Sequence, residues 1–547
     1  MALGVSTFPN ELWLSILTFP VLRRPDHISI SLTCHHIRSL ILPMLFEHLH
    51  LRPYAVDGSE ETPPTIATEA KLDAELARLA FWASDKIASS VRRCTLAGWW
   101  HSQRPQYRVA EDPYILQTAF LRAAGRFTHL KTLVATKIFF RSADLHALAS
   151  LTSIESFSVS LFRFAGDLVF PRNSWSLQSI TISPVYCAAY GVEQESRMLA
   201  TWFRLVNPAV LQRIALPEGP PYVRIDEAND PIVFPEVHTL STVCDGSAMD
   251  FHRFEALLAM VPNLRHLEVG PGAFIWPDLA ADEHSFSEAF PRCLSSLREL
   301  SIPVGLLSAF RTISSNGHGI QRLSIQRECS TARLLSLLTV GSPYVNVVDL
   351  EIENLDEDGD DLVRGVADLR EILTRLDRLE RVKVKAYYPP PITPLAATTC
   401  INTLLSLPAS LPVGLKFFAL TIKMHAPSVL REALPLPAAI DPPATVTTLR
   451  RRCPALEFVW IDALHFLIDW RVPGPGLRRV AGRRVRSSQS GQGLDTLPGN
   501  EDCQWAANFE VLDPYEPGQN IDQLAKLWQE LTPAWEARSQ NHDSDLD

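Results

Sequence analysis

Two short stretches of this sequence hold side chains whose types could do chemistry. The first, NLDEDGDDLVRG (354–365), has acidic residues at alternate positions, as in loops that bind calcium through carboxylate oxygens. With Gly359 at the sixth loop position, Asp356 and Asp358 fall at the third and fifth. Position twelve is Gly365 rather than the bidentate glutamate, and a strand rather than a helix is expected before the loop. A solvated acidic turn is the better interpretation.

The second stretch is Thr33-Cys34-His35-His36, which combines a thiol with two imidazoles. Adjacent histidines on a helix point about 100° apart, and Cys34 lies on an apolar stripe, so packing is the better interpretation. The sequence has no G-x-S-x-G, phosphate loop, dinucleotide fingerprint or H-E-x-x-H. We therefore expect no catalytic residue, no metal and no cofactor. An unrecognised hydrolase is the least favoured possibility, which activity against generic esters would test.

Composition narrows the class of protein further. A chain of 547 residues, 46% apolar and 20% charged, should form several domains or a repeat array. The net charge of −10 argues against generic nucleic-acid binding. The nine cysteines include no C-x-x-C pair, which favours a reducing compartment. No apolar run is long enough to span a membrane, and Asn10 and Glu11 interrupt any signal peptide, so we expect a cytoplasmic and/or nuclear protein.

One pattern recurs along most of the chain: a helical stretch, a short break, then apolar-x-x-apolar-x-apolar. The segment FHRFEALLAMVPNLRHLEV (251–269) shows the whole unit. The pattern resembles leucine-rich repeats, although the Asn that regular repeats place after the strand is mostly absent. This resemblance implies an α/β fold, an irregular solenoid over residues 91–486 with parallel strands on its concave face and helices on its convex face. The first apolar residues of the instances are Leu130, Ile154, Leu177, Leu211, Val237, Leu264, Leu297, Ile320, Val347, Leu379, Leu415, Leu456 and Leu477.

If the apolar residues point inward, the alternating residues face the concave surface. That surface would begin with a hydroxyl-rich floor formed by Ser156, Ser158, Ser160, Ser179, Thr181 and Ser183. Next we expect two adjacent strands that place Asp349, Glu351 and Glu353 beside Arg381, Lys383 and Lys385. The side chains that could bind a target protein are Arg381, Lys383, Lys385, Phe417, Phe458 and Trp460. Strand propensity with solvated charge is an equally good explanation.

The first fifty residues carry two helical patterns. Pro9 is placed to open the first, in which Leu12, Ile16 and Leu17 share a face. The second opens near Asp26 and is closed by Pro43. Its stripe consists of Ile30, Cys34 and Ile37, with Leu32 and Leu40 beside it.

These residues resemble the F-box, the helical module by which substrate receptors of fungal and other types dock onto the adaptor of a cullin–RING ubiquitin ligase. The match covers Ser6 to Leu51 and includes Phe8-Pro9, Glu11-Leu12, Ile16-Leu17, Leu32-Thr33-Cys34, Ile37-Arg38 and Leu42-Pro43-x-Leu45-Phe46. The resemblance implies a non-catalytic substrate receptor that holds the adaptor through its F-box and a target protein through its repeats. The implied adaptor-binding residues are Pro9, Leu12, Ile16, Leu17 and Leu32. A repeat scaffold without a ligase role is the alternative.

The remaining segments connect or end these two parts. Residues 6–51 form the F-box-like module, 52–90 a linker and first helix, and 487–500 a flexible Gly/Ser-rich linker. Residues 501–547 form an acidic tail with one helix near 520–531. We expect this helix to cap the basic end of the array at 445–486, because terminal repeats expose apolar surface.

Overall fold

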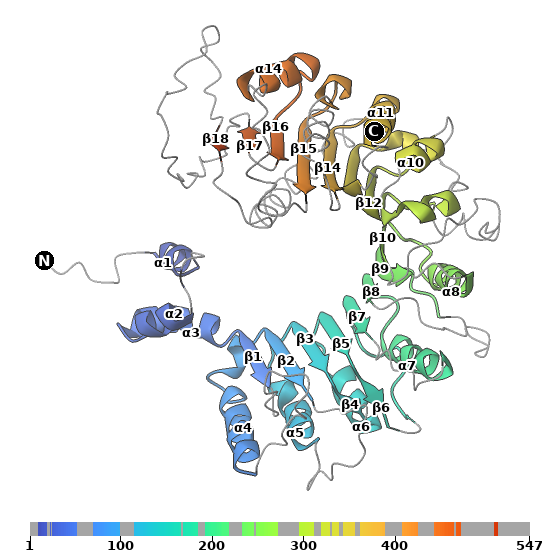
Figure 1. Ribbon diagram of the computed structural model, residues 1–547. Helices are drawn as coiled ribbons and strands as arrows, with labels where there is room; N and C mark the ends of the chain where they lie inside the picture. The colour runs from blue at the N-terminus through green and yellow to red at the C-terminus, as the bar shows by residue number, and fades with distance from the viewer. Residues whose placement is uncertain are drawn as a thin grey trace, which may run out of the picture. The chain divides into compact units, whose positions relative to one another are not determined.

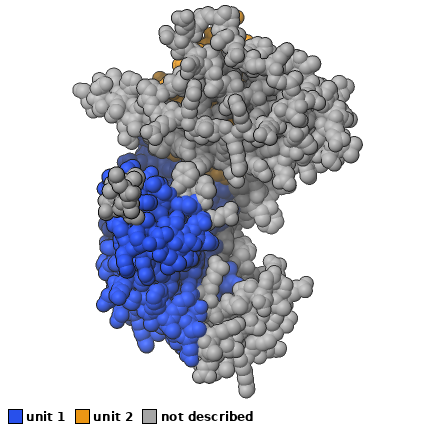
Figure 2. Space-filling model, turned by 90° about the vertical axis from the view of Figure 1, so that its left-hand side faces the viewer, with its two compact units in different colours: residues 1–298, 312–314 blue, residues 299–311, 315–547 orange. Residues whose placement is uncertain are grey.

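The computed structural model describes residues 9–18, 22, 24–51, 69–98, 114–165, 168–183, 192–217, 232–244, 248–271, 295–310, 319–328, 331–338, 343–355, 362–388, 407–424, 442–463, 466–471 and 508–511. The chain divides into two compact units (Figure 2). Unit 1 comprises Met1–Arg298 and Thr312–Ser314, and unit 2 comprises Glu299–Arg311 and Ser315–Asp547. The acidic-loop positions 356–361, the linker 487–500 and the tail helix at 520–531 lie outside the described residues.

Unit 1 begins with three short helices, α1 (Asn10–Leu17), α2 (Arg24–Ser31) and α3 (His35–Leu45). The expected second helix is therefore two helices. Cys34 breaks the helical run because its backbone is extended (φ −159°, ψ 162°), and its Sγ accepts a hydrogen bond from the Ile37 N–H at 3.4 Å, which caps α3. Pro43 lies inside α3 rather than closing it. Pro9 and Asp26 also shift in role: Pro9 is the residue before α1, and Asp26 lies within the first turn of α2.

The sheet of unit 1 has eight strands, and each pairs in parallel with the next in chain order, as Figure 1 shows. The strands are β1 (His48–Leu51), β2 (Arg93–Ala97), β3 (Thr132–Thr136), β5 (Ser156–Ser160), β7 (Ser179–Ser183), β8 (Arg213–Leu216), β9 (Thr239–Cys244) and β10 (His266–Pro271). The connecting helices lie on one face of the sheet: α4 (Glu69–Trp82), α5 (Ile115–Ala123), α6 (Ser142–Ala149), α7 (Val192–Leu205) and α8 (Ala248–Ala259). Two short strands, β4 (Phe139–Phe140) and β6 (Arg163–Phe164), pair with each other.

Unit 2 continues the same topology and then changes it. Six strands pair in parallel: β11 (Glu299–Pro303), β12 (Arg322–Glu328), β13 (Asp349–Leu355), β14 (Arg381–Tyr388), β15 (Phe417–Met424) and β16 (Phe458–Ala463). The described helices between them include α10 (Thr331–Leu337), α11 (Leu362–Arg375) and α14 (Pro442–Arg452), with shorter turns η5 (Val304–Phe310), η6 (Pro343–Asn346) and η7 (Leu407–Ser410). The last two strands, β17 (Phe466–Arg471) and β18 (Asn508–Val511), are antiparallel, so the all-parallel expectation fails at this end.

The repeat pattern of the sequence predicts the strands closely. Twelve of its thirteen instances lie in described residues, and in each a strand begins two residues after the first apolar residue. All twelve of these apolar residues are buried. The α/β fold class and the strand order of a leucine-rich-repeat-like array are thereby confirmed. The array starts earlier than residue 91, however, because β1 already belongs to the sheet.

The apolar residues of the strands pack against the helices. In unit 1, Phe157 of β5 lies 5.1 Å from Trp202 of α7, measured between ring centroids, and Phe140 meets the same indole edge-on at 5.0 Å. At the other end of the unit, Phe46 follows α3 and meets Trp82 of α4 edge-on at 5.1 Å. The three N-terminal helices are thus joined to the first repeat through packed aromatic rings as well as through β1.

Candidate functional site

The N-terminal helices expose an unusual amount of apolar surface. Nine large hydrophobic side chains are exposed among the described residues, and five of them lie between residues 12 and 32. Leu12 and Ile16 are about half exposed on one face of α1, and Leu32, between α2 and α3, is 77% exposed. The other two are Leu14 and Ile28. Exposed apolar side chains gathered in this way are typical of interaction sites.

Four of the five predicted adaptor-contact residues are exposed, and one is not. Pro9, Leu12, Ile16 and Leu32 are exposed, whereas Leu17 is 1% exposed. Leu17 packs with Ile37 and Ile41 in the core of the helical module. It is therefore a core residue that supports the exposed positions rather than one of them.

In unit 2 the expected neighbouring strands do pair. Asp349 of β13 lies opposite Arg381 of β14, and Glu351 lies opposite Lys383, with which it forms an ion pair. The predicted pairing of Glu353 with Lys385 stays a prediction, because the register shifts between Ile352 and Leu355.

The first residues of the six parallel strands of unit 2, β11 to β16, form a continuous row, which we call the charged row. Its members in order are Glu299, Arg322, Asp349, Arg381, Phe417 and Phe458. The carboxylates and guanidiniums alternate: Arg322 lies 3.7 Å from Glu299 and 3.5 Å from Asp349, and Arg381 Nη1 lies 3.5 Å from the same Asp349 oxygen. The Arg381 guanidinium then lies over the Phe417 ring, 5.5 Å from its centroid.

Most of the charged row and its neighbours are buried, which corrects the expectation of an exposed binding surface. Arg381 is 1% exposed, and Lys383, Phe417, Phe458 and Trp460 are also buried. Lys385 is the one predicted target-binding residue that is half-buried. Burial raises the pKa of the Asp349 carboxyl, although the Arg381 and Arg322 guanidiniums act to lower it. Of these residues, Arg381 and Lys383 contact carboxylates of the neighbouring strand β13.

In unit 1 the corresponding strands carry half-buried hydroxyl side chains instead of buried charges. On the face opposite the helices, Ser156, Ser158 and Ser160 lie beside Ser179, Thr181 and Ser183, as predicted. All six are half-buried, while the residues between them are buried. Ser160 Oγ donates a hydrogen bond to Thr136 Oγ1 at 3.1 Å, so the hydroxyl floor extends onto β3.

Two further arginines lie on this face and are not among the residues predicted from the sequence. Arg93 begins β2 and Arg213 begins β8, and both are exposed. Arg213 could have been found, because it follows Leu211 in the repeat pattern. Arg93 could not, because Cys94 stands where the pattern requires an aliphatic residue. Cys94 nevertheless packs like an aliphatic side chain: it is buried, and this burial raises the pKa of its thiol.

Two histidines border the same face. The rings of His48 and His50 on β1 lie 3.6 Å apart between centroids, and His48 Nε2 is 2.9 Å from Thr95 Oγ1. Burial lowers the pKa of His48, and His50 and Arg93 lower it further.

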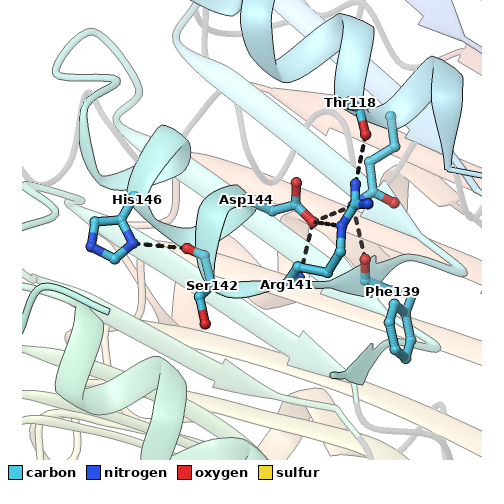
Figure 3. Close-up of polar contacts among 7 residues, drawn as sticks. Thr118, Phe139, Arg141, Ser142, Asp144 and His146 are labelled. Atoms are coloured by element: carbon cyan, nitrogen blue, oxygen red, sulfur yellow. Dashed lines mark hydrogen bonds and ion pairs between the residues drawn. The ribbon is translucent and has the colours of Figure 1, made fainter. Parts of the chain in front are cut away.

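A polar cluster at the start of α6 has a structural role (Figure 3). The Asp144 carboxylate accepts hydrogen bonds from the Arg141 backbone N–H at 2.9 Å and from Gln117 Nε2 at 3.0 Å. The Arg141 guanidinium donates to Thr118 Oγ1 at 2.6 Å, and His146 Nδ1 contacts the Ser142 carbonyl at 2.8 Å. These contacts satisfy the first turn of α6 and tie it to α5.

The described residues contain no group of three or more His, Cys, Asp or Glu that could hold a metal ion. None of their helices is both long enough and apolar enough to cross a membrane.

Comparison with known proteins adds little to this description. No family model matches the chain, and no curated protein matches it. Among solved structures it is similar to the crystal structure of a TLR13–ssRNA13 complex, at 14% identity and a TM-score of 0.22, over 71% of this chain and 60% of that one. The match thus spans less than two thirds of that protein's length.

Proposed function

We propose that this chain is a non-catalytic substrate receptor of a cullin–RING ubiquitin ligase, acting in the cytoplasm and/or nucleus. The observation that carries the proposal is the exposure of Leu12, Ile16 and Leu32 on a helical module that already has a closed core. These three residues stand where the sequence resembles the adaptor-contact positions of the F-box. Full burial of an exposed side chain of this size contributes about 1.5–3 kcal/mol, so the half-exposed Leu12 and Ile16 would each contribute about half of that against an adaptor, and Leu32 somewhat more.

The receptor would work by proximity. Holding a target protein near the ubiquitin-loaded enzyme raises the effective concentration of the target's lysines, so no side chain of this chain needs to react. The attachment of the helical module to the first repeat supports such a role. Phe46 packs on Trp82, and β1 pairs with β2, so the two parts of unit 1 are held together.

Adaptor binding tests the proposal directly. The Leu12→Asp and Ile16→Asp double variant should lose the adaptor in a pull-down from cells, with its circular dichroism unchanged. The matched control is Val169→Asp with Val413→Asp, because these side chains are 72% and 57% exposed and lie outside the helical module. Undiminished adaptor capture by the first variant would leave the scaffold function, without a ligase, as the better account.

Point substitutions are preferable here to deletion of the first 51 residues. Such a deletion would also remove β1, whose loss exposes the edge of β2.

A further inference from the structure

We infer that the unit 1 face opposite the helices binds an extended acidic peptide of the target protein, with carboxylates held by Arg93 and Arg213. This inference rests on the proposed function, since it specifies the class of segment that the receptor recognises. The two arginines belong to one row across the sheet. In register order that row runs His48, Arg93, Thr132, Ser156, Ser179, Arg213, Thr239 and His266.

Neither arginine is paired with another residue of the row. Both are exposed, and neither guanidinium makes a hydrogen bond or ion pair with another of the described residues. Arginines in the corresponding row of unit 2 behave differently, because Arg322 and Arg381 each contact a carboxylate on a neighbouring strand. In unit 1 the row neighbours are His48 and Thr132 for Arg93, and Ser179 and Thr239 for Arg213. None of these described neighbours carries a negative charge, so the two guanidiniums can bind a negatively charged ligand.

The surroundings favour a negatively charged ligand. The titratable groups of the described strands on this face are His48, His50, Arg93, Arg213, His266 and Glu268. Glu268 is the one carboxylate among them, and it lies on β10, two strands beyond Arg213. Between the arginines, Thr132, Ser156 and Ser179 offer hydroxyls that can hydrogen-bond the backbone of a peptide lying across the strands.

The spacing sets the length of the ligand. From β2 to β8 the sheet takes four steps, through β3, β5 and β7, and at about 4.8 Å per step the two arginines begin about 19 Å apart. An extended peptide rises about 3.4 Å per residue, so carboxylates about six residues apart would reach both guanidiniums. A single cluster of acidic residues could contact only one of the two arginines.

Fluorescence anisotropy with the full-length protein tests this prediction. The probes are fluorescein-labelled peptides of Gly, Ser and Ala that carry two Glu residues three, six or nine positions apart. The six-residue spacing should bind most tightly, and affinity should fall with added salt. Arg93→Gln and Arg213→Gln should each weaken its binding by up to about fivefold. Arg122→Gln and Arg172→Gln remove the same charge from exposed positions outside the row, and should change nothing.

Three results would overturn the inference: equal affinity for the three spacings, no effect of the row substitutions, or an equal effect of the control substitutions. Tighter binding of a labelled oligouridine, lost in the same two variants, would also overturn it and would assign the face to nucleic acid. Adaptor pull-down is measured in parallel. Because Arg93 and Arg213 lie outside the helical module, adaptor capture should persist in their variants, so failure of the peptide assay and failure of the proposed function are separate results.

Discussion

Single residues in this chain have different roles according to whether their row is buried. Lys131 and Glu155 form an ion pair between adjacent repeats with both side chains about 45% exposed, whereas Asp349 and Arg381 are 3% and 1% exposed. An exposed pair of this kind contributes about 0–1 kcal/mol, because water screens it. Removing one partner of a buried pair costs about 3–5 kcal/mol, since the other charge is left without compensation.

We therefore expect Asp349→Asn to lower the free energy of unfolding by about 3 kcal/mol, against less than about 1 kcal/mol for Glu155→Gln. Urea denaturation followed by circular dichroism measures both. The physical reason is that Arg381 would keep its charge in a buried site after its carboxylate partner is gone. Equal and small effects of the two substitutions would show that the charged row is solvated in solution.

Among the elements, the strands were the most predictable and the loops the least. Three apolar positions at i, i+3 and i+5 define a strand with one buried face, and this local signal is present at twelve of the described strands, although Cys94 interrupts it at β2. The split of the second N-terminal helix depended on the backbone of Cys34, which the apolar stripe of the same residues does not reveal. The burial of Arg381 and Phe417 was also out of reach, because it depends on packing across the strands rather than on the strand's own sequence.

The turns after β2, β3 and β5 lack the asparagine that regular leucine-rich repeats have at this point. Lys137 and Leu161 follow β3 and β5 with left-handed backbones, φ 57° and 51°. Gly98 follows β2, and its N–H bonds to the Thr136 carbonyl at 2.7 Å. A Cβ at Gly98 would lie 2.3 Å from the Lys137 carbonyl oxygen, so the two turns would have to separate.

Gly98→Ala should accordingly destabilise the protein by about 1–3 kcal/mol, the usual cost of overpacking. Gly125→Ala is the matched control, because a Cβ there would meet nothing within 4 Å. Thermal melting of both variants gives the comparison. A melting temperature of Gly98→Ala equal to that of the control would mean that the β2–β3 turns are not packed as closely as the structure places them.

At the scale of the whole molecule, stability is distributed along the chain. Apart from β4 and β6, which pair with each other, each described strand of a unit pairs with the strands of the adjacent repeats, so a repeat is supported mainly by the repeats on either side. In arrays of this kind, stability is close to a sum of repeat and nearest-neighbour contributions. A local defect should therefore loosen its own neighbourhood and leave distant repeats protected.

Hydrogen exchange of the two variants above would measure how far such a defect spreads. Asp349→Asn should speed exchange in β12 to β15 of unit 2 and leave the β1 to β5 amides of unit 1 as protected as in the parent protein. Gly98→Ala should speed exchange of the β1 to β5 amides in unit 1 and leave β12 to β15 of unit 2 as protected as in the parent protein. Adaptor capture depends on the helical module of unit 1, so Asp349→Asn should retain it despite its lower stability. Faster exchange throughout both units in either variant would instead show that the chain unfolds as one cooperative body, and that the repeats do not carry their stability locally.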